Sequence, residues 1–285
     1  MTIKFFSNYD TSANLLHRFR SNYIVTDEQL KFTIAEDYDF AIVFNRTDEL
    51  INPAAKIVTV IQEPSWSPAH NPTDFLEGSD YLLVHDKKLF ETKYSIRLRG
   101  EVIESPAYMF YHDRVDRTFY NYTTGTEKQK KLSMVVSYLN KPDGIYTKRI
   151  RLLNQILASD LEIDIYGRRL QIDDRRFKGP LDYKFIGLLP YEYSIAIENS
   201  EERNYITEKF VDCVICNTIP IYHGAPNILD VYDERYVRTI NLESPTVIED
   251  IKKIIAEPAP KTSINKSIYF NKYNLYTKLK EIILN

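Results

Sequence analysis

Short apolar runs rich in Ile, Val, Phe and Tyr alternate with polar, helix-forming stretches along most of the chain. Apolar runs of this length are typical of strands buried on both faces of a parallel sheet. Such strands are predicted at residues 3–7, 38–45, 56–62, 81–85, 131–137, 161–166, 193–197, 218–222 and 236–241. Helical spacing of apolar residues predicts helices at 12–20, 146–157, 208–217, 245–255 and 264–284. Strands that alternate with helices in this way indicate an α/β fold.

A polar, aperiodic stretch at residues 113–130 separates two such halves. A chain of 285 residues is long enough for two domains, because about 100–200 residues per domain is usual. We therefore predict an N-terminal α/β domain at residues 1–125 and a Rossmann-like domain at 126–262. The C-terminal segment, 263–285, is predicted to be a helix. In one arrangement that we consider, this helix packs back on the first domain.

Composition excludes several classes of protein. The formal net charge of −3 gives no overall electrostatic case for binding nucleic acid. No apolar run approaches the ~20 residues that span a bilayer, and the first residues lack a signal-peptide pattern, so we expect no transmembrane segment and a cytoplasmic protein. Cys213 and Cys216 form a C-x-x-C within a predicted helix, without a second ligand pair. Burial in the core is therefore favoured over a zinc or redox role, and it fits a reducing compartment.

Residues 191–226 combine a strand, a polar loop, a helix start and a second strand. Thr207 is the predicted N-cap of a helix that begins at Glu208. The positive end of a helix attracts anions such as phosphate, and Lys209 adds a positive charge at the same place. The Glu208 carboxylate can accept hydrogen bonds from two hydroxyl groups, as on a ribose. The alternative is an ordinary capped helix whose Glu and Lys side chains are solvated.

Three short sequences in this stretch resemble the signature of the α-1,3/1,4-fucosyltransferases, glycosyltransferase family ten. The chain has IENS at 197–200, YITEK at 205–209 and TIPIYHG at 218–224, where the family has FENS, Y[IV]TEK and [TV][IV]P[IV]YxG. The resemblance covers mainly residues 131–227. It implies a GT-B architecture, with two Rossmann-like domains facing a central cleft. It also implies that the second domain binds a sugar nucleotide, with Asn199 and Tyr205 as neutral donors beside Glu208 and Lys209.

The resemblance extends to the helix predicted at 146–157. In the family, an arginine at the start of this helix binds the phosphate of the donor. Counting back from the apolar positions of the helix, Arg149 falls in that place, with Lys148 and Arg151 as substitutes. The alternative for Arg149 is an exposed helix charge. Tyr138 stands where the family usually has Asn, which is a departure from the pattern.

Glu63 directly follows the strand predicted at 56–62, and active-site groups of open α/β sheets gather at the carboxyl ends of strands. The proposed general base of the fucosyltransferases is a glutamate in a similar segment, although this chain reads Glu-Pro-Ser where the family reads Glu-Ser-Pro. The resemblance implies that Glu63 accepts the proton of the acceptor hydroxyl. The alternative is a loop carboxylate that caps a nearby amide. Asp37 and Asp39 match a D-x-D metal pattern, but they precede a strand, so we predict a solvated turn and no metal site.

Together these features imply an inverting fucosyltransferase-like enzyme that transfers fucose from GDP-fucose to a hydroxyl of a glycan acceptor. Its leaving nucleotide would be stabilised by Lys209, Arg149, the Tyr205 hydroxyl and the amides of the helix start, with no cofactor and no required metal. One alternative is a related transferase with another sugar nucleotide, because Tyr138 and His223 depart from the family near the presumed donor site. The other is a sugar-nucleotide- or carbohydrate-binding protein without catalysis. Animal relatives carry a membrane anchor, so we expect a bacterial enzyme or a viral one made in the host cytoplasm, whose acceptor and oligomeric state are left open.

Overall fold

The structure is a computed structural model, and it describes residues 1–23, 25–108, 127–139, 141–260, 264 and 274–284. The chain divides into two compact units. Unit 1 comprises Met1–Arg117, Glu202–Thr207 and Ser267–Asn285, and unit 2 comprises Thr118–Glu201 and Glu208–Lys266. The domain boundaries predicted after residues 125 and 262, and most of the predicted linker at 113–130, lie outside the described residues and stay predictions. Sequence reasoning did not anticipate that Glu202–Thr207, inside the family signature, groups with unit 1.

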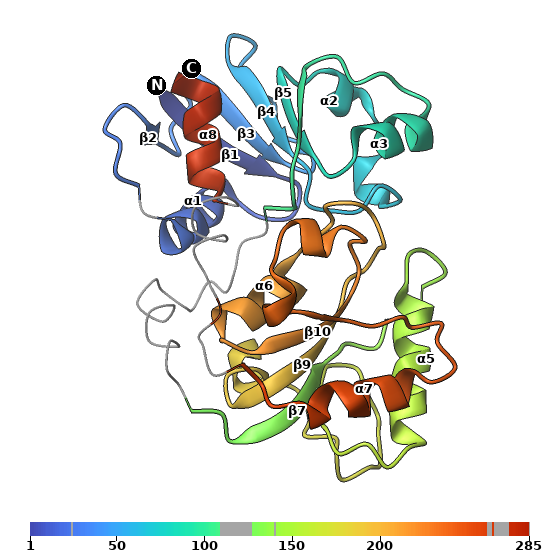
Figure 1. Ribbon diagram of the computed structural model, residues 1–285. Helices are drawn as coiled ribbons and strands as arrows, with labels where there is room; N and C mark the ends of the chain where they lie inside the picture. Colours follow the sequence, from blue (N-terminus) through green and yellow to red (C-terminus); the bar gives the residue numbers. More distant parts are fainter. Residues whose placement is uncertain (24, 109–126, 140, 261–263, 265–273, 285) are drawn as a thin grey trace. The chain divides into compact units, whose positions relative to one another are not determined.

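The described part of unit 1 contains a six-stranded parallel sheet in the order β2-β1-β3-β4-β5-β6 (Figure 1). Its strands are β1 (Thr2–Ser7), β2 (Lys31–Phe32), β3 (Phe40–Phe44), β4 (Lys56–Val60), β5 (Tyr81–Val84) and β6 (Glu101–Glu104). All five residues of β3 are buried, because helices or loops cover both faces of the sheet. The sequence order reverses at β1, which pairs with β2 on one side and β3 on the other.

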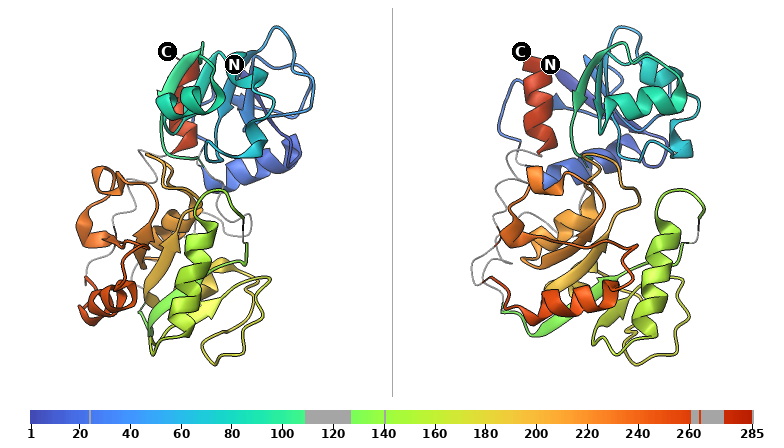
Figure 2. Two further views of the ribbon diagram at one scale, coloured as in Figure 1. Left: turned by 90° about the vertical axis from the view of Figure 1, so that its right-hand side faces the viewer. Right: turned by 45° about the vertical axis from the view of Figure 1, so that its right-hand side comes forward.

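Helices cover the two faces of this sheet (Figures 1 and 2). They are α1 (Ser12–Asn22), α2 (Asp74–Glu77), α3 (Lys87–Tyr94) and α8 (Leu275–Leu284), with a 3₁₀ turn at Pro68–His70. One core joins α1 and α8 to the sheet through Phe19, Leu279, Phe5 and Ile42. A second core packs Phe90 of α3 and Leu76 of α2 against β5. Of the helix predicted at 264–284, the described portion is α8, which packs within unit 1.

Unit 2 contains a five-stranded parallel sheet among its described residues, in the order β11-β10-β9-β7-β8. Its strands are β7 (Lys130–Val135), β8 (Asp164–Tyr166), β9 (Tyr191–Ile197), β10 (Ile219–His223) and β11 (Arg238–Thr239). Its helices are α5 (Tyr146–Leu157), α6 (Glu208–Ile215) and α7 (Val247–Ala256), with 3₁₀ turns at Lys184–Gly187, Ile228–Asp230 and Glu234–Tyr236. Because β7 pairs with both β8 and β9, the connections run in opposite directions at that point. Open α/β sheets bind ligands at the carboxyl ends of the two strands that flank such a switch.

The predicted fold class, α/β with two parallel-sheet domains, is confirmed. Most predicted strands and helices appear within a few residues of their predicted bounds, and α5 has the predicted ends. The strand predicted at 161–166 is shorter: the Arg176 guanidinium donates a hydrogen bond to the Leu161 carbonyl, and only Asp164–Tyr166 joins the sheet. The short elements β2, β6, α2 and α3 were not predicted.

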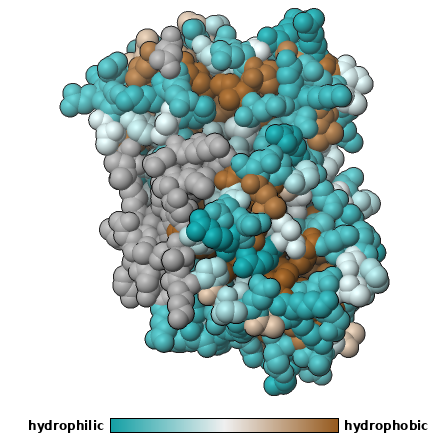
Figure 3. Space-filling view, viewed as in Figure 1, coloured by the Kyte–Doolittle hydropathy of each residue, from teal (hydrophilic) through white to brown (hydrophobic). Residues whose placement is uncertain are grey.

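Hydrophilic residues cover most of the described surface in the view of Figure 3, and exposed apolar residues appear in smaller groups between them. Within the described ranges, no helix has the length and apolar character needed to cross a membrane. Cys213 and Cys216 are both buried and unbonded to each other, as expected for core residues, and burial raises the pKa of the Cys213 thiol to about 12.

Candidate donor-binding site

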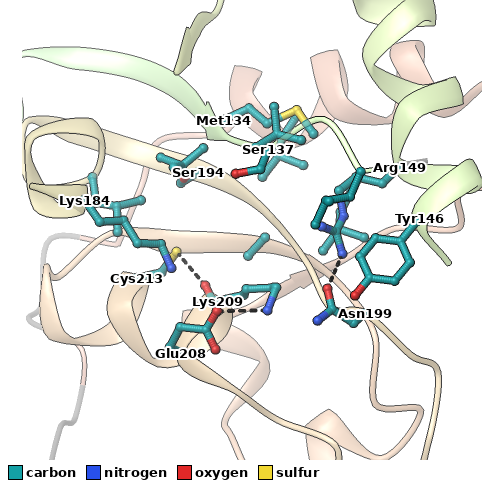
Figure 4. A pocket seen from close by; sticks show the side chains of 17 residues that line it. Met134, Ser137, Tyr146, Arg149, Lys184, Ser194, Asn199, Glu208, Lys209 and Cys213 are labelled. Atoms are coloured by element: carbon teal, nitrogen blue, oxygen red, sulfur yellow. Dashed lines mark hydrogen bonds and ion pairs between the residues drawn. The ribbon is translucent and has the colours of Figure 1, made fainter. Parts of the chain in front are cut away.

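A pocket of about 350 Å³ opens in unit 2 at the carboxyl ends of β7 and β9 (Figure 4). Its walls come from these two strands, from the first turns of α5 and α6, and from the 3₁₀ turn at Lys184–Gly187. The pocket therefore lies at the switch point of the sheet, where a ligand is expected on topological grounds. Four residues predicted from the sequence to bind the donor line it: Arg149, Asn199, Glu208 and Lys209.

Arg149 comes from the first turn of α5 and is only 7% exposed. Its Nη2 donates to the Glu198 carbonyl oxygen at 2.6 Å and to Asn199 Oδ1 at 2.8 Å. Its guanidinium also lies over the Tyr146 ring, 5.2 Å from the centroid. These contacts fix the orientation of the guanidinium on the pocket wall, and they exclude the alternative of an exposed helix charge.

The two basic neighbours that sequence reasoning kept as substitutes for Arg149 do not line this pocket. Lys148 instead contacts Glu201 at 3.1 Å and Glu243 at 3.4 Å. Arg151 contacts the same Glu243 at 2.8 Å. Of these three basic residues, only Arg149 lines the pocket, and its contact with donor phosphate stays a prediction.

Glu208 and Lys209 open α6 at the pocket edge. The Lys209 ammonium lies 2.9 Å from Glu208 Oε1 and 4.0 Å from Oε2 of Glu198, whose side chain is fully buried. The Tyr222 hydroxyl donates to Glu198 Oε1 at 3.5 Å, and a Cβ added at Gly224 would lie 2.4 Å from Glu198 Cγ. The glycine of the TIPIYHG sequence is therefore needed to leave room for a buried carboxylate beneath Lys209.

Lys184 is a pocket residue that sequence reasoning missed. It forms an ion pair with Asp212 of α6, with a distance of 2.7 Å. Burial alone would lower the pKa of Lys184, but the carboxylates of Asp212 and Glu208 outweigh it and hold that pKa above its ordinary value. No motif marks Lys184, since it lies in a short 3₁₀ turn with no periodic pattern. The spacing of Glu208 and Asp212, four residues apart on one helix, was the only available signal.

Tyr205 is placed differently from the other predicted donor-binding residues. Its side chain is 2% exposed, does not line the pocket, and packs edge-on against the His85 ring in unit 1, with centroids 5.0 Å apart. A donor contact by Tyr205 therefore stays a prediction.

Glu63 belongs to unit 1, where it follows β4 and is half-buried. Its amide donates to Asn45 Oδ1 at 3.1 Å, and its carbonyl oxygen lies 3.2 Å from Nε2 of both His70 and His85. The main chain at Glu63 is thus held on both sides. A catalytic role for its carboxylate stays a prediction.

The D-x-D residues lie at the surface of unit 1. Both Asp37 and Asp39 are exposed, and the Asp39 carboxylate accepts hydrogen bonds from the Thr2 amide at 2.7 Å and the Thr2 hydroxyl at 3.1 Å. These bonds lower the pKa of Asp39. In the part of the chain that the structure describes, no group of three or more His, Cys, Asp or Glu side chains is placed to hold a metal ion.

Comparison with known families identifies the segment that carries this pocket. Residues 125–254 match the family described as glycosyltransferase family 10 (fucosyltransferase) C-term. This segment is similar to the C-terminal part of glycosyltransferase family 10 and makes up less than half of the chain. Every residue that lines the pocket falls inside the family 10 segment, so the resemblance inferred from the short motifs is confirmed.

Known relatives also match part of the chain. They include a fucosyltransferase-like protein of Arabidopsis thaliana (30% identical over 120 residues, 41% of this chain and 22% of that protein) and GDP-fucose protein O-fucosyltransferase 3 of Mus musculus (34% over 80 residues, 26% and 17%). Alpha-(1,3)-fucosyltransferase B of Drosophila melanogaster is 38% identical over 84 residues, 26% of this chain and 18% of that protein. The matched stretch thus spans about a fifth of the length of these relatives.

Solved structures share the fold over nearly the whole chain. An alpha1,3-fucosyltransferase aligns with a TM-score of 0.56 at 15% identity and covers 98% of this chain and 88% of that one. Anabaena Alr3699/HepE in complex with UDP-glucose aligns with a TM-score of 0.59 at 12% identity, over 100% and 99% of the two chains. At such low identity these likenesses establish the fold, and they place the chain in the predicted GT-B class.

Proposed function

We propose that this chain is a fucosyltransferase-like glycosyltransferase whose family 10 segment binds GDP-fucose in the unit 2 pocket. The observation that carries the proposal is the gathering of Arg149, Asn199, Glu208 and Lys209 around one cavity at the switch point of the sheet. The names of the relatives support the donor, and so does the solved structure of an alpha1,3-fucosyltransferase with GDP-fucose, which has the same fold (TM-score 0.55, 15% identity).

The pocket side chains suit a sugar nucleotide in two ways. Arg149 presents a planar cation held in one orientation by Asn199 Oδ1 and the Glu198 carbonyl, and an oriented guanidinium suits phosphate oxygens. Lys209 adds a mobile ammonium at the start of α6, where helix amides also favour an anion. The Glu208 carboxylate accepts hydrogen bonds from the ribose hydroxyl groups.

In the proposed reaction, an acceptor hydroxyl attacks the anomeric carbon of fucose in line with the leaving group. The new carbon–oxygen bond forms as the bond from that carbon to GDP breaks, so the configuration inverts and GDP leaves with the electron pair. The hydroxyl proton passes to Glu63, a step that typically contributes 10²–10⁴-fold. Arg149 and Lys209 offset the charge that develops on GDP, so we propose that transfer needs no metal.

The test measures donor use by the purified chain. It is incubated with GDP-fucose and other sugar nucleotides, with and without EDTA, together with glycan acceptors. We expect turnover of GDP-fucose that EDTA does not abolish and that Glu63→Gln removes. Turnover only of a different donor would overturn the assignment of fucose.

A pair of variants tests the site itself. Glu208→Ala should weaken GDP binding about tenfold or more in calorimetry, because the ribose loses a charged acceptor. Glu249→Ala is the matched control, since Glu249 is an exposed carboxylate on α7 of the same unit, away from the pocket. Full GDP affinity in Glu208→Ala would contradict the assignment of this pocket as the donor site.

One observation supports UDP-sugars as an alternative class of donor. The Anabaena structure in complex with UDP-glucose has this fold, so the fold is compatible with UDP as well as GDP nucleotides. Thermal shift with GDP and UDP distinguishes the two donors, because a ligand at 100 times its Kd stabilises the native state by about 2.7 kcal/mol. A larger shift with UDP would favour a transferase with another sugar.

A further inference from the structure

The loop that carries the proposed base is held from several sides by buried polar side chains of unit 1. Asn45, which is 4% exposed and has a left-handed backbone (φ 57°), accepts from the amides of both Gln62 and Glu63 through Oδ1, at 2.7 and 3.1 Å. Asparagine tolerates this backbone conformation better than most residues. One side chain therefore fixes two consecutive amides at the point where the chain leaves β4.

Two histidines hold the carbonyl of the same residue. His70 and His85 are fully buried, and each places Nε2 3.2 Å from the Glu63 carbonyl oxygen. Since a carbonyl only accepts, each ring carries its proton on Nε2. Burial lowers the pKa of both rings to about 4, so both are neutral near pH 7. The Glu63 main chain is thus bound through its amide by Asn45 and through its carbonyl by two rings.

The third contact comes from the family signature. Glu202 is 8% exposed, and its carboxylate accepts from the Ser65 amide at 2.9 and 3.1 Å and from the Ser65 hydroxyl at 3.1 Å. Asn204 donates to the His85 carbonyl oxygen at 2.8 Å, and Tyr205 packs against the His85 ring. The segment Glu202–Thr207 therefore contacts both the Glu63 loop and one of the histidines that hold it.

This segment lies directly between donor-site residues in the sequence. Asn199 precedes it and Glu208 follows it, and both line the unit 2 pocket. Removing a carboxylate from water is costly unless hydrogen bonds compensate, and the Ser65 amide and hydroxyl supply such bonds to Glu202. A segment between donor-site residues thus holds Ser65, two positions after Glu63.

We propose that Glu202 and His85 are positioning residues for transfer: they hold the Glu63 loop and tie it to the segment that joins the two halves of the donor signature. This role rests on the proposed function. It predicts that occupation of the donor pocket is communicated to the loop through Glu202–Thr207. It also predicts that loosening Glu202 impairs transfer more than donor binding.

Kinetics of paired variants test the positioning role. Glu202→Ala should lower kcat for fucose transfer at least tenfold while GDP affinity in calorimetry stays within about twofold of wild type. Glu202→Gln, which keeps an acceptor for the Ser65 amide, should recover most of the loss. His85→Phe, which keeps a ring but removes the Nε2 donor, should behave like Glu202→Ala, and His85→Gln should recover part of the turnover. Glu201→Ala is the matched control, because Glu201 is the adjacent but exposed glutamate.

Hydrogen exchange gives a readout besides turnover. Saturating GDP should slow amide exchange at residues 63–67 in wild type, and this effect should be lost in Glu202→Ala even though the variant still binds GDP. If the wild type is active and Glu202→Ala has an unchanged kcat, the positioning role alone is overturned. The same holds if GDP does not change amide exchange at residues 63–67 of the wild type. A wild type that neither binds GDP nor transfers fucose would overturn the proposed function and this role together.

Discussion

Ion pairs balance much of the charge around the donor pocket. Lys184 pairs with Asp212, and Lys209 lies between Glu208 and the buried Glu198. Net positive charge is therefore not what would attract a nucleotide to this site. We infer that donor binding exchanges partners: ribose hydroxyls take up Glu208, and the Lys209 ammonium turns to phosphate. In this exchange the hydroxyl groups donate hydrogen bonds to the Glu208 carboxylate, and the phosphate takes the place of that carboxylate beside Lys209.

The buried histidines predict an acid-sensitive fold. His70 and His85 have pKa values lowered by burial from 6.5 to about 4, so both are neutral in the native state and gain a proton on unfolding below pH 6.5. Their contribution is fully present above pH 6.5 and is lost as the pH falls towards 4. The expected loss is about 1.4 kcal/mol per pH unit for each ring at the steepest point. Urea unfolding at pH 7, 6 and 5 measures this slope.

The matched variant for this prediction is His85→Gln, which keeps a neutral donor and removes one titrating group. Its stability should fall between pH 6.5 and 4 with about half the slope of the wild type, whatever its stability at pH 7. Equal slopes in the two proteins would show that His85 titrates normally in the native state.

At the residue scale, sequence predicted the pocket residues that belong to a contiguous signature. Asn199, Glu208 and Lys209 fall within about ten residues of one another, and Arg149 was placed by helix spacing. The contacts of the Glu63 loop were not predictable in this way. Glu202 meets Ser65 across 137 positions of sequence, and Asn204 meets His85 across 119. Local patterns carry no information about pairings at that separation.

Gly167 allows the chain that follows β8 to lie close to the chain that follows β7. An added Cβ there would lie 1.6 Å from the Val136 carbonyl oxygen, and Val136 lines the donor pocket. Gly167→Ala must therefore push the chain at Val136 away. The free energy of unfolding should fall by about 1–3 kcal/mol because of overpacking. GDP affinity should fall as well, because the pocket wall moves. Urea unfolding and calorimetry measure the two effects.

Gly179→Ala separates this steric effect from backbone strain. Gly179 has φ +88° and no atom within 4 Å of an added Cβ, and its carbonyl accepts from the Gly167 amide. Its substitution should cost about 1–2 kcal/mol through the left-handed backbone alone and leave GDP affinity unchanged. If both variants weakened GDP binding equally, overlap with Val136 would not be the cause.

At the element scale, strongly periodic segments were predictable and weakly patterned ones were not. The amphipathic α5 and the buried β3 have clear periods, so their positions followed from sequence. The two-residue strand β2 has no period to detect, and it exists because β1 pairs with it. At the start of the shortened β8, the Arg176 side chain donates a hydrogen bond to the Leu161 carbonyl, which a longer strand would have included.

At the scale of the whole molecule, the two units are interleaved in sequence rather than consecutive. Unit 1 comprises Met1–Arg117, a segment of the donor signature (Glu202–Thr207) and the stretch that contains helix α8. The predicted order of domains along the chain does not include the first of these insertions. Turn residues and polarity mark Glu198–Asn204 as a loop, but which sheet a loop contacts depends on tertiary pairing.

Because the core beneath α8 consists of unit 1 residues only, damage there should impair the proposed transfer without impairing GDP binding. Leu279 is fully buried against the sheet, and Leu279→Ala should cost about 2–5 kcal/mol. Amide exchange should then rise in β1, β3 and Glu202–Thr207, and change little in β9 and β10. GDP affinity should persist while transfer falls, because the pocket is built by unit 2 and the Glu63 loop by unit 1.

The control is Glu281→Ala, an exposed change on the same helix, which should alter neither GDP affinity nor transfer. An equal rise of amide exchange in β9 and β10 of Leu279→Ala would contradict separate cores.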